Sequence, residues 1–210
     1  MICFKLKQTN STMKILRITF TVLFLFFVLF QSIVIMATNK TEEQKYTVLQ
    51  KDNDFEIRFY PAATFATIQS KANTYRDLSS PGFRKLAGYI FGNNESSAHI
   101  SMTSPVHMDV NDTLSSMSFV MPSAYNKTNL PIPKDEAVTI NEVPEEYVAV
   151  LRFGGYANDD KMKRYSENLK NILTQKEIKT IGRFRFLGYN PPYQFIGRRN
   201  EIIVSIEWKK

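Results

Sequence analysis

The most constraining feature of the sequence is an uncharged, apolar run of nineteen residues near the N-terminus, ITFTVLFLFFVLFQSIVIM, from Ile18 to Met36. A run of this length is enough to cross the hydrocarbon core of a bilayer as a helix. The residues before it include basic side chains and no acidic ones: Lys5, Lys7, Lys14 and Arg17. Because a basic flank stays on the cytoplasmic side, we expect the chain from Thr38 onward to face away from the cytoplasm.

Residues 1–37 are therefore predicted to be either a permanent membrane anchor or a cleavable export signal. The basic start and the small residue Ala37 directly after the run also suit a signal that is removed near Ala37, which would release a periplasmic or secreted form. A buried core helix is a poorer interpretation, because a helix that is apolar on all sides needs more burial than the rest of the chain can supply.

The net charge of the chain without this segment bears on whether it binds nucleic acid. The chain has 27 basic and 20 acidic residues and a formal charge of +7, but 23 basic and all 20 acidic residues follow Ala37, so the remainder carries only +3. We therefore expect no nucleic-acid partner. The single cysteine, Cys3, precedes the apolar run, so the exported part has no disulfide and no thiolate to bind zinc or haem iron.

Residues 38–210 are predicted to form one domain whose first half reads strand, strand, helix, strand, strand. A helix is expected to begin at Ser80 and Pro81 and to end at Gly92, because apolar residues recur on one helical face between them. The runs that predict strands are YTVLQ from Tyr46, FEIRFY from Phe55, ATFATIQ from Ala63, HISMTSPVHMDV from His99 and SMSFVMP from Ser116.

The same order then repeats after a loop that contains two prolines, Pro131 and Pro133. The segment AVTINEVPEEYVAVLRFGGY predicts two strands, Asp159 or Asp160 is expected to cap a helix, and RFRFLGY and NEIIVSIEW predict two closing strands. We therefore expect an α+β fold built from a duplicated ββαββ unit, whose two halves join their sheets and contribute one long helix each. A helix lying across a curved sheet leaves a groove that suits a small apolar ligand.

Five motifs in this part of the chain resemble the SOUL haem-binding proteins, and the resemblance extends from Tyr46 to Trp208. They are FRKLAGYIFGNN (83–94), ISMTSPV (100–106), MSFVMP (117–122), VAVLRFGGYA (148–157) and GYNPP followed by GRRNE (188–201). Their order and spacing match the family. The resemblance implies a distorted β-barrel or paired sheets flanked by two helices, and a tetrapyrrole as the ligand.

The resemblance also assigns the haem pocket to the first helix and to the nearby GYNPP loop. The residues that it implies are Phe83, Leu86, Ala87, Ile90, Tyr189, Tyr193, Arg198 and Arg199. The two tyrosines would lie against the macrocycle, and the two arginines would pair with its propionates. The alternative is that both arginines only clamp a turn beside Asn200 and Glu201.

The sequence departs from the family at positions where relatives have haem ligands. Phe59 stands where one branch has a histidine, and Gln194 and Gly88 stand where another branch has lysines. His99 and His107 are the only histidines, and His107 is the better candidate for a metal ligand. We expect haem of the non-covalent b type, or another tetrapyrrole, to be held mainly by apolar contact and propionate pairing.

The predicted function is the binding of haem or a related tetrapyrrole in an apolar groove, for carriage, buffering or scavenging. An enzyme is not expected, because the sequence contains no HExxH motif, no Gly-rich phosphate loop and no Ser-His-Asp order. Two alternatives are a general module that binds apolar ligands or partners, as in the bacterial effector-binding domains that the duplicated architecture resembles, and an enzyme that removes the metal from a tetrapyrrole.

Overall fold

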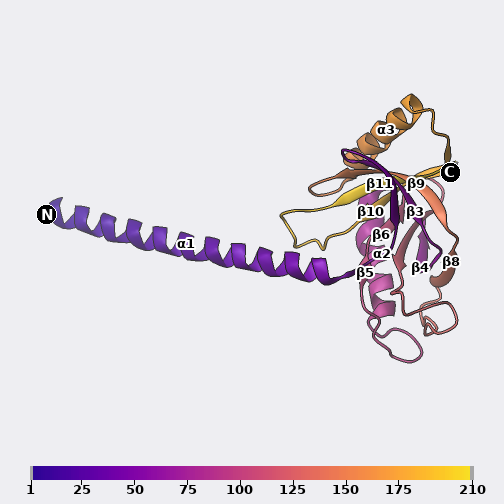
Figure 1. The fold of residues 1–210 in the computed structure, drawn as a ribbon. Coiled ribbons are helices and arrows are strands. Elements are labelled where there is room, and N and C mark those ends of the chain that lie inside the picture. Colours follow the sequence, from indigo (N-terminus) through magenta and orange to yellow (C-terminus); the bar gives the residue numbers. More distant parts are fainter. Residues whose placement is uncertain (1, 209–210) are drawn as a thin grey trace.

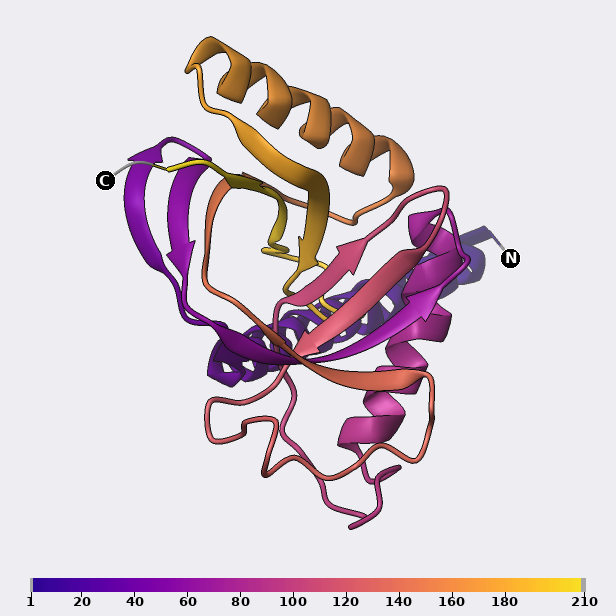
Figure 2. The same ribbon diagram turned by 90° about the vertical axis from the view of Figure 1, so that its right-hand side faces the viewer.

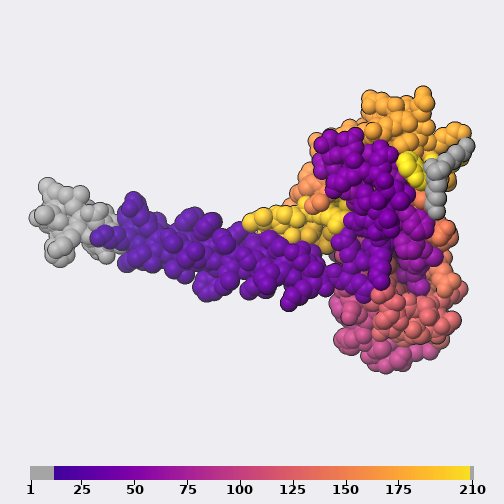
Figure 3. Space-filling view, in the orientation of Figure 1, coloured from indigo at the N-terminus to yellow at the C-terminus, as the bar shows by residue number. Residues whose placement is uncertain are grey.

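The computed structural model describes residues 2–208, and side chains from residue 12 onward. The apolar run forms part of helix α1 (Ile2–Lys40), which projects from the folded domain as a long rod (Figures 1 and 3). The part from Thr12 to Lys40 is long and apolar enough, by length and composition, to cross a membrane. Most of its apolar side chains are exposed, so α1 is not a core helix of the domain.

The domain after α1 contains one large sheet, one two-stranded ladder and two helices, α2 (Tyr75–Ile90) and α3 (Asp159–Gln175). The strands are β1 (Glu42–Glu43), β2 (Thr47–Asp52), β3 (Phe55–Tyr60), β4 (Ala63–Ser70), β5 (Thr103–Ser104), β6 (Val106–Asp109), β7 (Ser115–Val120), β8 (Val138–Val143), β9 (Glu146–Phe153), β10 (Thr180–Gly188) and β11 (Asn200–Ile206). The α+β class and the repeated order of strands and helices are as predicted.

The nine strands of the large sheet lie in the order β2-β3-β9-β11-β10-β6-β7-β4-β8, and all neighbours in it are antiparallel. The two halves, β3-β4-α2-β6-β7 and β8-β9-α3-β10-β11, meet at the β10-β6 pair, and equivalent strands follow in the same order on each side of it. Each half gives its first strand to the other, since β3 pairs with β9 and β8 pairs with β4. The outer strands β2 and β8 do not pair in the part of the chain described, so the curved sheet stays open rather than closing into a barrel.

Both helices of the domain begin earlier than the sequence predicts. The N-cap of α2 is Thr74, whose hydroxyl accepts a hydrogen bond from the backbone N–H of Asp77, and Pro81 lies inside the helix. Ser80 is therefore not the cap. The prediction was wrong because Pro81 was taken as a first-turn proline, whereas the pair Thr74 and Asp77 is a sufficient start signal. Helix α3 is capped by Asn158, one residue before the predicted position.

The two helices cover the same face of the sheet, α2 over β4 and β7 and α3 over β9 and β11 (Figure 2). That face carries the main apolar core, which includes Leu86 and Ile90 of α2 and Leu169 and Leu173 of α3. Side chains on the opposite face form a second, smaller cluster around Tyr60, Val148, Val150, Leu187, Tyr189 and Ile203. Alternation along each strand divides the candidate site residues between these two faces.

Candidate ligand-binding site

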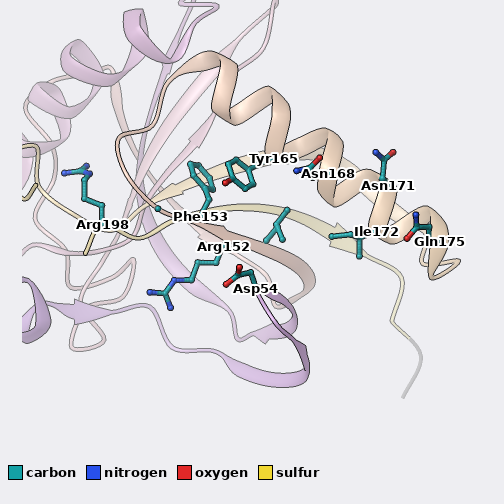
Figure 4. Close-up of a pocket in the computed structure, with 11 residues that line it drawn as sticks. Asp54, Arg152, Phe153, Tyr165, Asn168, Asn171, Ile172, Gln175 and Arg198 are labelled. Atoms are coloured by element: carbon teal, nitrogen blue, oxygen red, sulfur yellow. The ribbon is translucent and has the colours of Figure 1, made fainter. Parts of the chain in front are cut away.

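A groove of about 640 Å³ lies between α3 and the C-terminal end of β9 (Figure 4). Its volume falls within the range of small-molecule sites, which is roughly 300 to 1,000 Å³. The residues that line it are Asp54, Leu151, Arg152, Phe153, Gly154, Tyr165, Asn168, Asn171, Ile172, Gln175 and Arg198. It is the helix-and-sheet groove that the duplicated pattern predicts, formed in the second half of the domain.

The floor of the groove contains aromatic and aliphatic side chains, and polar and charged side chains form at least as much of the lining. Phe153 and Tyr165 stack with ring centroids 4.2 Å apart and an interplanar angle of 11°. Ile172 follows Tyr165 on the same side of α3, two turns further along, and is half-buried. Asn168 and Gln175 lie on the same helix and are exposed. A flat, mainly apolar ligand with polar edges matches this arrangement.

Arg198 stands at the end of the groove nearest the loop that connects β10 and β11 (Figure 4). Its guanidinium donates hydrogen bonds to the carbonyl oxygens of Pro191 (2.6 Å), Gln194 (2.8 Å) and Asn190 (3.3 Å), and lies 4.3 Å from the ring centroid of Tyr156. Its Nε is one of two buried side-chain nitrogen or oxygen atoms without a hydrogen-bond partner in the described part of the chain. Because this Nε is shielded from solvent, the backbone carbonyls of the loop are the groups that hold the guanidinium of Arg198 in place.

The predicted residues of α2 lie on a different surface, because α2 and α3 cover separate parts of the sheet. Leu86 and Ile90 are fully buried in the main core and contact the sheet. Phe83 is largely exposed, with its ring packed edge-on against Phe119 at 5.2 Å, and Ala87 is half-buried. Of the four α2 residues, only Phe83 and Ala87 therefore present surface to a ligand in this conformation. None of the four lines the α3 groove.

The predicted loop residues are divided between three environments. Arg198 lines the groove, Tyr193 is exposed at the tip of the loop, and Tyr189 is buried on the opposite face of the sheet. Arg199 lies over the ring of Tyr189 at 3.7 Å and pairs with Glu201 and Glu43. In this structure Arg199 therefore stabilises the turn through ion pairs, as in the alternative interpretation of the two arginines. Its contact with a ligand stays a prediction.

Glu201, which is 0% exposed, is the centre of this buried cluster. Its carboxylate accepts two hydrogen bonds from Arg58 (2.8 and 3.0 Å), one from Nε of Arg199 (2.9 Å) and one from the hydroxyl of Tyr189 (2.7 Å). Burial by itself would raise the pKa of Glu201, but the hydrogen bonds and charges of Arg58 and then Arg199 hold this pKa below its ordinary value. Burial and the adjacent carboxylate raise the pKa of Tyr189, so this tyrosine stays a hydroxyl donor.

His107 also lies on the face opposite the helices. On β6 it pairs in register with Leu187, whereas Met108 pairs with Phe186 of the main core, so the two side chains take opposite faces. His107 Nε2 is 2.7 Å from Oε1 of Gln44, and its ring packs edge-on against Phe65 at 5.0 Å. Burial and then the charge of Arg185 lower the pKa of His107 to about 3, which keeps the imidazole neutral. This histidine does not line the α3 groove.

Comparison with known proteins agrees with the motifs. The sequence profile of the family described as SOUL heme-binding protein matches residues 41–205. The chain belongs to the SOUL haem-binding family. Heme-binding protein 1 of Xenopus laevis is 30% identical over 155 residues, which are 70% of this chain and 81% of the relative. Heme-binding protein 2 of Mus musculus is 30% identical over 157 residues, which are 70% of this chain and 76% of the relative.

Solved structures share the fold of this SOUL chain at much lower identity. The crystal structure of the EcmrR C-terminal domain is 10% identical and has a TM-score of 0.51, and the match covers 78% of this chain and 99% of that domain. The crystal structure of a hydrolase from Listeria innocua is 9% identical and has a TM-score of 0.51, with 76% of this chain and 94% of that chain covered. At this identity the likeness concerns the fold alone.

The groove residues that the sequence did not assign to a site are chiefly Phe153, Tyr165 and Ile172. Tyr165 and Ile172 lie on the apolar face of the second helix, where the spacing of apolar residues by itself indicates core packing. The duplication was the available signal: a groove expected beside the first helix has a counterpart beside the second. Phe153 belongs to the motif VAVLRFGGYA, which carried the resemblance without a role of its own.

Proposed function

We propose that this chain binds haem or a closely related tetrapyrrole without covalent attachment, in the groove between α3 and β9. The observation that carries the proposal is the groove itself: a stacked pair of aromatic rings lines it and Arg198 stands at one end. Membership of a family whose relatives are named for haem binding supports the ligand class.

The lining of the groove provides no imidazole, thioether or thiolate for iron. Apolar contact with the floor and pairing of a propionate with Arg198 would therefore hold the ligand, in agreement with the departures seen in the sequence. Binding of this kind suits carriage, buffering or scavenging, in which the ligand must also be released. The names of the relatives support binding rather than catalysis.

We further propose that α1 attaches the domain to a membrane, with the domain on the side away from the cytoplasm. The length and composition of Thr12–Lys40 support a membrane-spanning segment, and the basic residues before Ile18 support the orientation. A ligand groove beside a membrane would receive an apolar ligand that partitions into lipid. Cleavage near Ala37 is the competing fate of the segment.

The binding proposal is tested by titrating ferric haem into the full-length chain in a mild detergent and recording the Soret band. A shifted band that saturates at one haem per chain is the expected result. Absence of any shift would refute the proposal. If unrelated apolar dyes still bound, the chain would be a general apolar-ligand module instead.

The location of the ligand is tested with a substitution that fills the groove. Asn168→Trp places a bulky ring at the rim without removing a core side chain, and haem affinity is expected to fall at least tenfold. Lys170→Trp is the matched control, because Lys170 is exposed on α3 outside the groove. Phe83→Ser probes the surface of α2. If only Phe83→Ser weakened binding, the ligand would lie on α2 and the assignment to the α3 groove would be wrong.

A further inference from the structure

The loop between β10 and β11, residues 189–199, has most of its backbone carbonyls bonded from within the protein although it contains no regular structure. Arg198 donates to the carbonyls of residues 190, 191 and 194, and the hydroxyl of Tyr156 donates to that of residue 192 at 2.9 Å. The side chain of Gln194 donates to the carbonyl of Ile196 at 3.0 Å. Pro191 and Pro192 have no N–H to satisfy. Each of these internal bonds lowers the cost of moving the irregular backbone out of water.

The tip of this loop is apolar and exposed. Tyr193, Phe195 and Ile196 are 54%, 53% and 54% exposed. In a loop whose polar groups point inward, three neighbouring apolar side chains point outward. Such a patch on a water-exposed surface is unfavourable, and it marks a site of contact with another apolar phase.

The loop of residues 189–199, the tip loop, lies against the C-terminal half of α1 (Figure 3). The contact stripe on the helix is Gln31, Val34, Ile35 and Thr38, spaced as one face of a helix. The side-chain carbonyl of Gln31 accepts from the N–H of Phe195 at 2.8 Å, and its amide donates to the carbonyl of Tyr193 at 3.2 Å. The hydroxyl of Thr38 donates to Oε1 of Gln194 at 2.9 Å.

This contact gives a polar residue of the apolar run a structural role. Gln31 is only 2% exposed, and an amide inside a membrane-spanning segment is costly unless it is hydrogen-bonded. Here the loop supplies both bonds. A signal that is cut off near Ala37 would leave the N–H of Phe195 and the carbonyl of Tyr193 without these partners.

The contact also sets the depth of the loop relative to a membrane. Gln31 precedes Met36, the end of the apolar run, by five residues, or about 8 Å along the helix axis. Phe27, whose ring centroid is 6.0 Å from that of Phe195, lies about 14 Å from that end. Since a hydrocarbon core is about 30 Å thick, both positions fall within its half next to the domain.

We propose that α1 is retained and that the tip loop inserts beside it into the membrane leaflet that faces the domain, with Tyr193, Phe195 and Ile196 in contact with acyl chains. The proposal rests on the proposed role of α1 as a membrane anchor. It adds a second point of attachment, which fixes the orientation of the domain and holds Arg198 and the adjoining end of the groove close to the lipid surface.

The test measures the depth of the loop in the full-length chain. Cys3→Ser removes the single thiol, and Phe195→Cys then allows attachment of an environment-sensitive fluorophore at the tip. The protein is placed in phosphatidylcholine vesicles that contain a nitroxide quencher near the middle of the acyl chain. Ile181→Cys is the matched control, since Ile181 is 52% exposed but lies seven residues, about 23 Å along β10, from Gly188.

Strong quenching at position 195 with little at position 181 is the expected result. If both labels stay unquenched while the intact chain floats with the vesicles, the anchor is real and the inserted loop is refuted. If the chain does not float with the vesicles, or is recovered from cells without residues 1–37, the proposal that α1 is a retained membrane anchor is refuted. If the fluorescence of the label at position 195 changes with the number of protein chains per vesicle rather than with the quencher, a second copy of the chain covers the loop instead of lipid. This result would also overturn the proposal.

A second substitution tests whether α1 positions the loop. Gln31→Leu makes the helix more apolar, so it cannot weaken anchoring, but it removes both hydrogen bonds to the loop backbone. Quenching at position 195 is expected to fall by about half or more while flotation is unchanged. Unchanged quenching would show that the loop does not depend on the helix, which contradicts the proposed joint attachment.

Discussion

Replacing Glu201 by glutamine removes the charge from the centre of the buried cluster and keeps its size. In the folded protein the carboxylate is inaccessible to water and accepts four hydrogen bonds, three of them from the guanidinium groups of Arg58 and Arg199. Breaking a buried ion pair by removing one partner costs about 3 to 5 kcal/mol, because the other charge is left buried without compensation. Glu56 and Glu43 still pair with the two arginines, so we expect a loss near the lower end, about 3 kcal/mol at pH 7.

The measurement is urea unfolding of the full-length chain in a mild detergent, followed by the fluorescence of Trp208. Trp208 is the only tryptophan and packs against the main core, so it reports unfolding of the domain. Glu207→Gln is the matched control, because Glu207 is 59% exposed and its carboxylate forms a long, exposed ion pair, with Oε2 3.9 Å from Nζ of Lys179. An exposed pair contributes less than about 1 kcal/mol.

The pH dependence gives an independent check. The pKa of Glu201 is lowered in the folded protein, so its contribution is fully present above the pKa of an unfolded glutamate, about 4.3, and is lost as the pH falls below it. The difference between the wild type and Glu201→Gln should therefore narrow below pH 4. If the variant unfolds within about 1 kcal/mol of the wild type at pH 7, the cluster does not stabilise the fold as reasoned.

Two further predictions concern other buried polar groups. His107→Ala should leave the Soret band of bound ferric haem unchanged, since the imidazole lies on the sheet face opposite the groove. It should also reduce the fall in the free energy of unfolding as the pH is lowered from 6.5 to 3. In that range the histidine takes up a proton in the unfolded chain but not in the folded protein, where the pKa of His107 is about 3. His99→Ala is the control, because His99 is exposed. Asn94→Ala should lower the free energy of unfolding by about 2 to 3 kcal/mol, because Asn94 is fully buried and makes three hydrogen bonds to the backbone of Tyr89 and Ala98. The exposed Asn93→Ala should change the unfolding midpoint little, and an equal effect of both would contradict the argument.

The local elements of this fold could be predicted from the sequence. Runs rich in β-branched and aromatic residues marked the strands from Phe55 and Ala63, and apolar spacing of three and four marked both helices. The opposite orientations of His107 and Met108 followed from strand geometry alone. The start of α2 was misplaced because Pro81 is compatible with two positions, and only the hydrogen bond between Thr74 and Asp77 decides which residue is the cap.

The arrangement of those elements could not be predicted in the same way. The pairing of β3 with β9 and of β8 with β4 joins each half to the other. Such pairings depend on contacts between distant segments, which leave no periodic signal in either one. The eight residues assigned to one pocket lie on α2, on the tip loop, in the α3 groove and in the buried cluster on the opposite face of the sheet, and their contact with a ligand stays a prediction.

The sequence by itself determined the apolar helix, the duplicated ββαββ order, the absence of thiols beyond residue 37 and the family. These are properties of residue type and short spacing, which the chain carries wherever it folds. The tertiary structure decided that Arg199 pairs with Glu201 and Glu43, that Arg198 ends a groove beside α3, and that Gln31 bonds the tip loop. Each of these contacts joins residues from different elements or from opposite ends of a loop. The role of a charged or amide side chain depends on the groups that packing brings within hydrogen-bonding distance of it.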